Sequence, residues 1–78
     1  MDIHNLVRMA NQIGSFYESL PDAAEASREI ANHIKKFWEP RMRREILAYV
    51  DKEAGAGLSA VVLASIQSNK EMLTPAPA

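Results

Sequence analysis

The sequence contains no cysteine, which excludes disulfide bonds, thiolate nucleophiles and thiolate metal ligands. It also lacks a long apolar stretch, since the longest uninterrupted run, residues 60–64, is far shorter than the roughly 20 residues of a membrane-spanning helix. The N-terminus shows neither the basic nor the apolar region of a secretory signal. A strong excess of one charge is missing too, because the 78 residues carry a formal net charge of −1. We therefore expect a cytoplasmic protein that does not enter a membrane.

Patterns that support catalysis are absent as well. His4 and His33 have no third partner at a metal-binding or acid–base spacing, and no serine lies in a nucleophile elbow or triad pattern. The three glycines, Gly14, Gly55 and Gly57, do not spell a phosphate-binding loop. We expect no catalytic, cofactor-binding or metal-binding residue in this chain.

What the sequence does have is helical periodicity, because apolar residues recur every three or four positions along most of it. The predicted helices cover about residues 3–20, 23–38, 40–52 and 60–69. No alternation of period two indicates a strand, so the predicted fold class is all-α, a small bundle of three or four short helices. We expect a single helical domain over residues 1–73 and a disordered Pro/Ala tail over residues 74–78.

Individual residues predict where these helices begin and cross. Asp2, Asp22 and Ser59 are expected to cap helix starts, and Pro40 suits the first position of the third helix. Gly14 lies inside the first helix, where glycine costs about 1 kcal/mol relative to alanine. This cost indicates a close helix crossing at Gly14.

Some apolar residues do not fit one buried stripe per helix. Phe37 continues the stripe of the second helix, while Trp38 lies on a weaker edge. Leu47 lies off the stripe of the third helix, and Val61 and Leu63 lie off that of the fourth. We expect some of the last three to stay exposed in a monomer and to mark an interface, although scattered apolar surface residues are also common.

Charge is concentrated in residues 35–44, which hold five of the nine basic residues and one acid. One interpretation is a phosphate-binding patch with Trp38 stacking on a base, and another is an anchor for a protein partner, since Trp and Arg are enriched at interface hot spots. For Lys35 and Lys36 we favour a third interpretation, in which both are solvated side chains near a helix C-terminus and their positive charge complements the helix dipole. For the rest we favour a protein partner, because a net acidic chain lacks the broad basic field of nucleic-acid binders. The candidate partner-binding residues are Trp38, Pro40, Arg41, Met42, Arg43 and Arg44.

Three stretches carry a family resemblance: residues 37–44 (FWEPRMRR), 9–14 (MANQIG) and 56–59 (AGLS). With them the chain resembles, over roughly residues 5–67, the delta subunit of soluble NAD-dependent formate dehydrogenase. The run Trp-Glu-Pro-Arg-Met-Arg is the specific part. Family members often have aspartate where this chain has Glu39, a conservative difference.

The resemblance implies an accessory subunit, itself without cofactors, in a cytoplasmic enzyme complex. That complex oxidises formate to carbon dioxide with a molybdenum or tungsten pterin, iron–sulfur clusters, FMN and NAD. The expected partner is its large catalytic subunit, which the delta subunit would stabilise or help to mature.

Within the resembling segment we assign a role to each motif residue. Pro40 would set a corner between two helices, with Trp38 and Met42 packing it. Arg41 and Arg43 would pair with carboxylates or carbonyls of the partner. The alternative function is a small helical nucleic-acid-binding protein that uses the basic cluster of residues 35–44.

Overall fold

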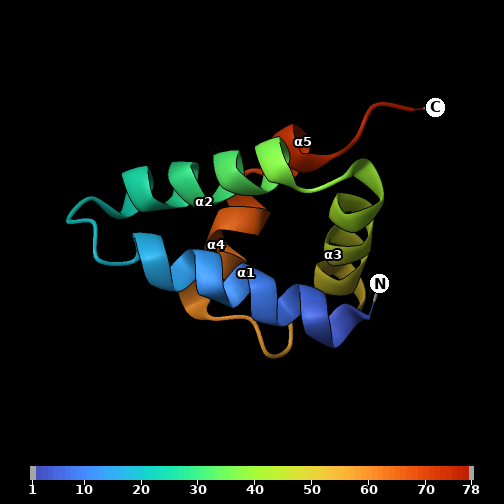
Figure 1. Cartoon of the computed structure of the whole chain (residues 1–78), viewed down its shortest axis with the longest axis horizontal. Coiled ribbons are helices and arrows are strands. Elements are labelled where there is room, and N and C mark those ends of the chain that lie inside the picture. The colour runs from blue at the N-terminus through green and yellow to red at the C-terminus, as the bar shows by residue number, and fades with distance from the viewer. Residues whose placement is uncertain (1, 78) are drawn as a thin grey trace.

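The computed structural model describes residues 2–77, so the ends of the predicted domain and tail, Met1 and Ala78, lie outside the described residues. The helices are α1 (Ile3–Tyr17), α2 (Ala23–Phe37), α3 (Pro40–Glu53), α4 (Ala60–Ser68) and α5 (Lys70–Leu73) (Figure 1). Residues 2–77 contain no strand, which confirms the all-α class. The first four helices are the predicted ones, and α5 is an additional single turn. The boundary at residue 73 and the disorder of the tail stay predictions.

Three of the predicted helix starts are confirmed. The Asp2 carboxylate accepts a hydrogen bond from the backbone N–H two residues further on, at 3.1 Å, and Asp22 does the same at 3.0 Å. Pro40 is the first residue of α3, where a helix has no partner for an N–H. These local features explain why α1, α2 and α3 begin where they do.

The start of α4 is held differently from the prediction. Ser59 occupies the N-cap position, but its side chain makes no capping hydrogen bond. Its backbone N–H instead donates to the side-chain oxygen of Asn11 in α1, and the Asn11 amide donates to the carbonyl of Gly57, both at 2.9 Å. The loop itself turns through left-handed backbone at Gly55 and Gly57, with φ of 69° and 89°. One side chain of α1 therefore fixes the entry into α4.

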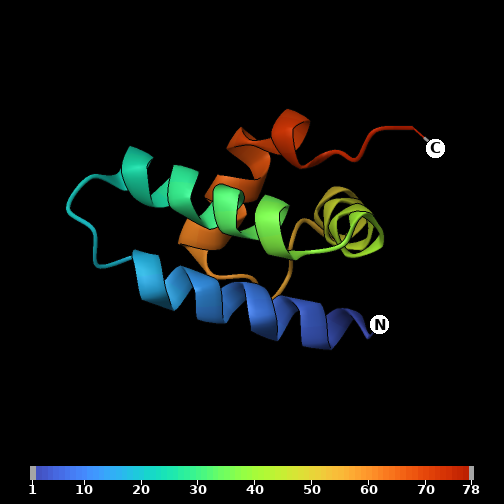
Figure 2. The ribbon, with the colours of Figure 1, turned by 45° about the horizontal axis from the view of Figure 1, so that its top comes forward.

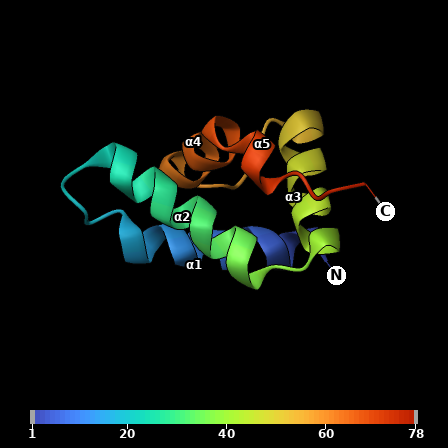
Figure 3. The ribbon, with the colours of Figure 1, turned by 90° about the horizontal axis from the view of Figure 1, so that it is seen from above.

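The helices surround one core. α1 and α2 form an antiparallel pair, and α3 crosses the end at which α1 begins and α2 ends (Figures 1 and 2). α4 packs mainly against α2 and also contacts α1, and α5 contacts both α2 and α3, so this pair of short helices lies on one face of the α1–α2 pair (Figure 3). The radius of gyration, 11.4 Å, is close to the roughly 11.5 Å expected of a compact chain of this length. No helix within residues 2–77 is long and apolar enough to cross a membrane.

Every helix contributes buried side chains to this core. Its largest fully buried apolar members are Leu6, Ile30, Ile34, Ile46, Val62, Ile66 and Leu73. Gly14 lies beside it at the predicted close crossing, which is confirmed: a Cβ at this position would overlap Cγ2 of Val62 in α4. The absence of a side chain at Gly14 thus lets α1 and α4 approach each other.

The C-terminal end of α2 differs from the prediction. Phe37, expected on the buried stripe, is 65% exposed, whereas Trp38 is 5% exposed and belongs to the core. Trp38 is the C-cap residue that follows α2, and its backbone is extended, with φ −91° and ψ 135°. Helical periodicity no longer applies there, so the indole can turn inward and fill the position expected for Phe37.

The expectation that leftover apolar residues of α3 and α4 would be exposed is also wrong. Leu47 is buried, and Val61 and Leu63 are half-buried against the core. Both helices contact several others, so each buries more than one stripe. Among residues 2–77, the large apolar side chains that remain exposed are Phe16, at 75%, and Phe37.

Candidate protein-binding groove

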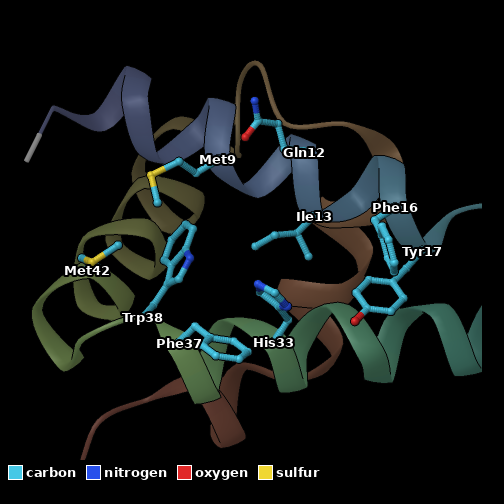
Figure 4. A pocket seen from close by; sticks show the side chains of 9 residues that line it. All are labelled: Met9, Gln12, Ile13, Phe16, Tyr17, His33, Phe37, Trp38 and Met42. Atoms are coloured by element: carbon cyan, nitrogen blue, oxygen red, sulfur yellow. The ribbon is translucent and has the colours of Figure 1, made fainter.

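Both exposed phenylalanines line one apolar groove of about 510 Å³ between α1 and α2 (Figure 4). The first residues of α3 close one of its ends, and the groove opens to solvent between the two helices. We call it the α1–α2 groove. Its lining residues are Met9, Gln12, Ile13, Phe16, Tyr17, His33, Phe37, Trp38 and Met42.

A row of rings crosses the groove from one helix to the other. Phe16 stacks edge-to-face on Tyr17 with ring centroids 4.9 Å apart. The ring centroids of Tyr17 and His33 are 6.4 Å apart. The ring centroids of His33 and Phe37 are 4.7 Å apart. Aromatic side chains bring a large apolar area and few rotatable bonds to an interface. Exposed apolar surface of this kind marks an interaction site more often than exposed polar surface does.

The end of the groove at α3 is made of more flexible side chains. Met9 and Met42 are half-buried against the core and flank Trp38 (Figure 4). Methionine adapts its shape to what it contacts, because it is unbranched and polarizable. The groove therefore combines a fixed aromatic row with an adaptable end.

The structure brings only part of the predicted partner-binding set together. Trp38 and Met42 line the groove, and Pro40 sets the corner between α2 and α3 as expected. Arg44 is exposed, and Arg41 is exposed beside Glu45, with which it forms an ion pair at 3.6 Å.

The five basic residues of the cluster point to different sides. Arg43 is half-buried and its Nη1 donates to the carbonyl of Leu73 at 3.4 Å, while Lys35 donates to the carbonyl of Met72 at 3.3 Å. Both therefore hold α5 in place. Lys36 instead lies over the Phe37 ring, with its Nζ 5.8 Å from the centroid. Lys35 and Arg43 therefore contact α5, whereas Lys36 lies at the edge of the groove.

Phe16, Tyr17 and His33 were missed by reasoning from the sequence. One signal was available, because Phe16 lies off the apolar stripe of its helix and an aromatic ring placed there must face solvent or a partner. Among residues 2–77, no group of three or more His, Cys, Asp or Glu side chains is placed to hold a metal ion.

Together, the fold and the groove define a small all-α protein with an aromatic-lined, solvent-open groove beside a basic helix corner. The family model of the NADH-dependent formate dehydrogenase delta subunit, FdsD, matches residues 5–66. The chain therefore belongs to this family. The match confirms the resemblance carried by residues 9–14, 37–44 and 56–59. No curated protein sequence and no solved structure matches the chain significantly.

Proposed function

We propose that this chain is a non-catalytic accessory subunit of a cytoplasmic NAD-dependent formate dehydrogenase and that it binds the large metal–pterin catalytic subunit. Membership of the delta-subunit family carries the proposal. Binding would stabilise the catalytic subunit or assist its maturation. The molybdenum or tungsten pterin, the iron–sulfur clusters and FMN would be held by other subunits, since a chain without cysteine offers no thiolate to a cluster.

The partner-binding surface we propose is the α2–α3 corner, residues 38–44. Arg41 and Arg44 are exposed, so their guanidinium groups are free to form bidentate pairs with carboxylates of the partner. The present partner of Arg41 is Glu45 on the same helix face. Exposed ion pairs of this kind contribute little free energy, so Arg41 can exchange Glu45 for a carboxylate of the partner at little cost. Trp38, Pro40 and Met42 support this role by holding the corner in shape.

The test of this function is co-expression of the catalytic subunit, with its other subunits, in the presence and absence of this chain. Size-exclusion chromatography, metal and cluster content, and formate-dependent NAD reduction are then compared. We expect co-elution of the chain with the catalytic subunit, and lower activity or cofactor content in its absence. Lack of association together with unchanged activity would refute the proposal.

A matched pair of arginine variants tests the corner itself. Replacing Arg41 and Arg44 together by alanine should weaken association about tenfold, which is roughly 1.4 kcal/mol. The control replaces Arg8 and Arg28 together by alanine, because both are exposed arginines outside the corner and the variant loses the same two charges. Equal effects of the two variants would show that only overall charge matters.

A further inference from the structure

The α1–α2 groove has the shape of a site for one helix. Its two walls are antiparallel helices, and α3 closes one end (Figure 4). Along α1, the lining runs from Met9 to Tyr17, which is a little over two helical turns or about 12 Å at 1.5 Å per residue. An amphipathic helix bound in such a groove presents residues at positions i, i+3 or i+4, and i+7 to it.

The two ends of the groove carry opposite charge. At the α3 end, Lys36 lies over the ring of Phe37 and Arg41 is exposed next to Met42. Residues 35–45 carry five basic side chains against two acids, Glu39 and the Glu45 that pairs with Arg41, so this end keeps an excess of positive charge. The other end, at the turn between α1 and α2, carries three exposed acids: Glu18, Asp22 and Glu25. A helix that is acidic at one end and neutral or basic at the other complements the groove in one direction only.

We infer that the α1–α2 groove binds an amphipathic helix of the catalytic subunit, with the acidic end of that helix beside Lys36 and Arg41. The inference rests on the proposed function, because it assigns the partner and adds a second contact to the corner. Phe16 and Phe37 are the anchors on the two walls, and the methionines adapt to the side chains that enter the groove. A second copy of this chain fits less well, since a two-fold contact would place the same hollow opposite itself.

The occupant is identified by photo-crosslinking in the assembled complex. Phe16 or Phe37 is replaced by the photo-reactive analogue p-benzoylphenylalanine, and the crosslinked peptides are sequenced by mass spectrometry. Both positions should crosslink to the same segment of the catalytic subunit, and the Phe37 position to the more acidic end of it. The analogue at Gln67, an exposed position on α4, should not crosslink to that segment.

Variants measure the contribution of the two anchors. Phe16→Ser combined with Phe37→Ser should weaken association by about 30-fold or more, as expected of interface hot spots, whereas Gln67→Ser should have no effect. Circular dichroism should show an unchanged helix content, because both phenylalanines are exposed. If the double variant fails to fold, the crosslinks from the Phe16 and Phe37 positions decide whether the groove binds the catalytic subunit.

The outcomes separate this inference from the proposed function. If the wild-type chain assembles but Phe16 and Phe37 crosslink to unrelated regions, to a second copy or to nothing, the groove inference is wrong and the proposed function stands. If the wild-type chain does not assemble with the catalytic subunit, both are wrong. Crosslinks to one segment in the reversed direction would refute the charge argument and leave the groove as the binding site.

Discussion

Trp38 ties the corner between α2 and α3 to the core. It follows the last residue of α2, its side chain is buried, and the exposed Phe37 precedes it. Two adjacent aromatic residues thus have opposite tasks, one inside the protein and one in the groove. The indole also forms part of the groove wall, so losing it would change the groove as well as the core.

Trp38→Ala should therefore destabilise the fold before it affects any contact with a partner. Removing a buried aromatic side chain costs about 3–5 kcal/mol, a large share of the roughly 4–12 kcal/mol available to a chain of this size. Urea denaturation followed by circular dichroism measures the loss. Phe37→Ala is the control and should change stability by less than about 1 kcal/mol. A stable Trp38→Ala variant that no longer binds would instead make Trp38 an interface anchor.

Gly14→Ala should destabilise the protein although alanine favours helix. The gain in helix propensity is about 1 kcal/mol, but the new Cβ would overlap Val62, which is fully buried, and overpacking costs about 1–3 kcal/mol. Thermal unfolding should show a net loss, whereas Ser15→Ala, at an exposed neighbour, should not. The loss should shrink in a Val62→Ala background. Additive effects of the two changes would contradict the close crossing.

At the scale of elements, α1 organises its neighbours through polar as well as apolar contacts. The Asn11 side chain joins α1 to the loop before α4 through two hydrogen bonds, and Tyr49 of α3 donates to the carbonyl of Ala56 in the same loop at 2.6 Å. The stretches 9–14 and 56–59, which are far apart in the sequence, are thereby joined. Their place in the family motif has a structural explanation that involves no partner.

Asn11→Ala should loosen the loop between α3 and α4. It leaves the Gly57 carbonyl and the Ser59 N–H without their partner, at a cost of about 1 kcal/mol for each. Hydrogen exchange should become faster at the Ser59 amide, because local opening exposes it. Asn32→Ala, which changes an exposed asparagine of α2, should leave this amide protected. Unchanged exchange at Ser59 in the Asn11 variant would contradict the bridging role.

The single turn of α5 contributes to the core despite its length. Leu73 is fully buried, and the carbonyls of Met72 and Leu73 accept hydrogen bonds from Lys35 and Arg43. The family match ends at residue 66, so this part of the core lies beyond it.

Leu73→Ala should cost about 2–5 kcal/mol of stability, as expected for a fully buried leucine. Leu20→Ala is the matched control, because Leu20 is half-exposed in the turn between α1 and α2, and it should cost less than about 1 kcal/mol. Denaturant midpoints of both variants give the comparison. If Leu73→Ala is as stable as the Leu20 variant, α5 is not part of the cooperative unit.

At the scale of the whole molecule, a small helical core supports the open α1–α2 groove and the charged corner between α2 and α3. The buried residues converge between the helices, and the exposed aromatic residues gather on one side of the α1–α2 pair. Such a molecule gains stability from a partner that binds only the folded form. This is what the proposed role as an accessory subunit requires.

Salt dependence should distinguish this role from nucleic-acid binding. Between 50 and 200 mM salt, a protein that contacts five phosphates loses roughly 500-fold in affinity. We expect association with the catalytic subunit to fall by less than about tenfold, since the groove contacts are apolar and the charges lie at its rim. Titrations at the two salt concentrations measure the ratio. A steep decrease, together with binding of RNA or DNA by the chain alone, would favour the alternative.

The sequence by itself determined the features that depend on neighbouring residues. Period, proline and capping side chains are local signals, so the all-α class, the first four helices, the corner at Pro40 and the crossing at Gly14 were predictable. The family followed from short motifs for the same reason. Tertiary structure alone decided which of Phe37 and Trp38 is buried, where the basic residues point and that Phe16 and Phe37 line the same groove. These outcomes depend on how α3 and α5 pack against the helix pair, and such packing joins residues about 20 to 40 positions apart, which no local pattern records.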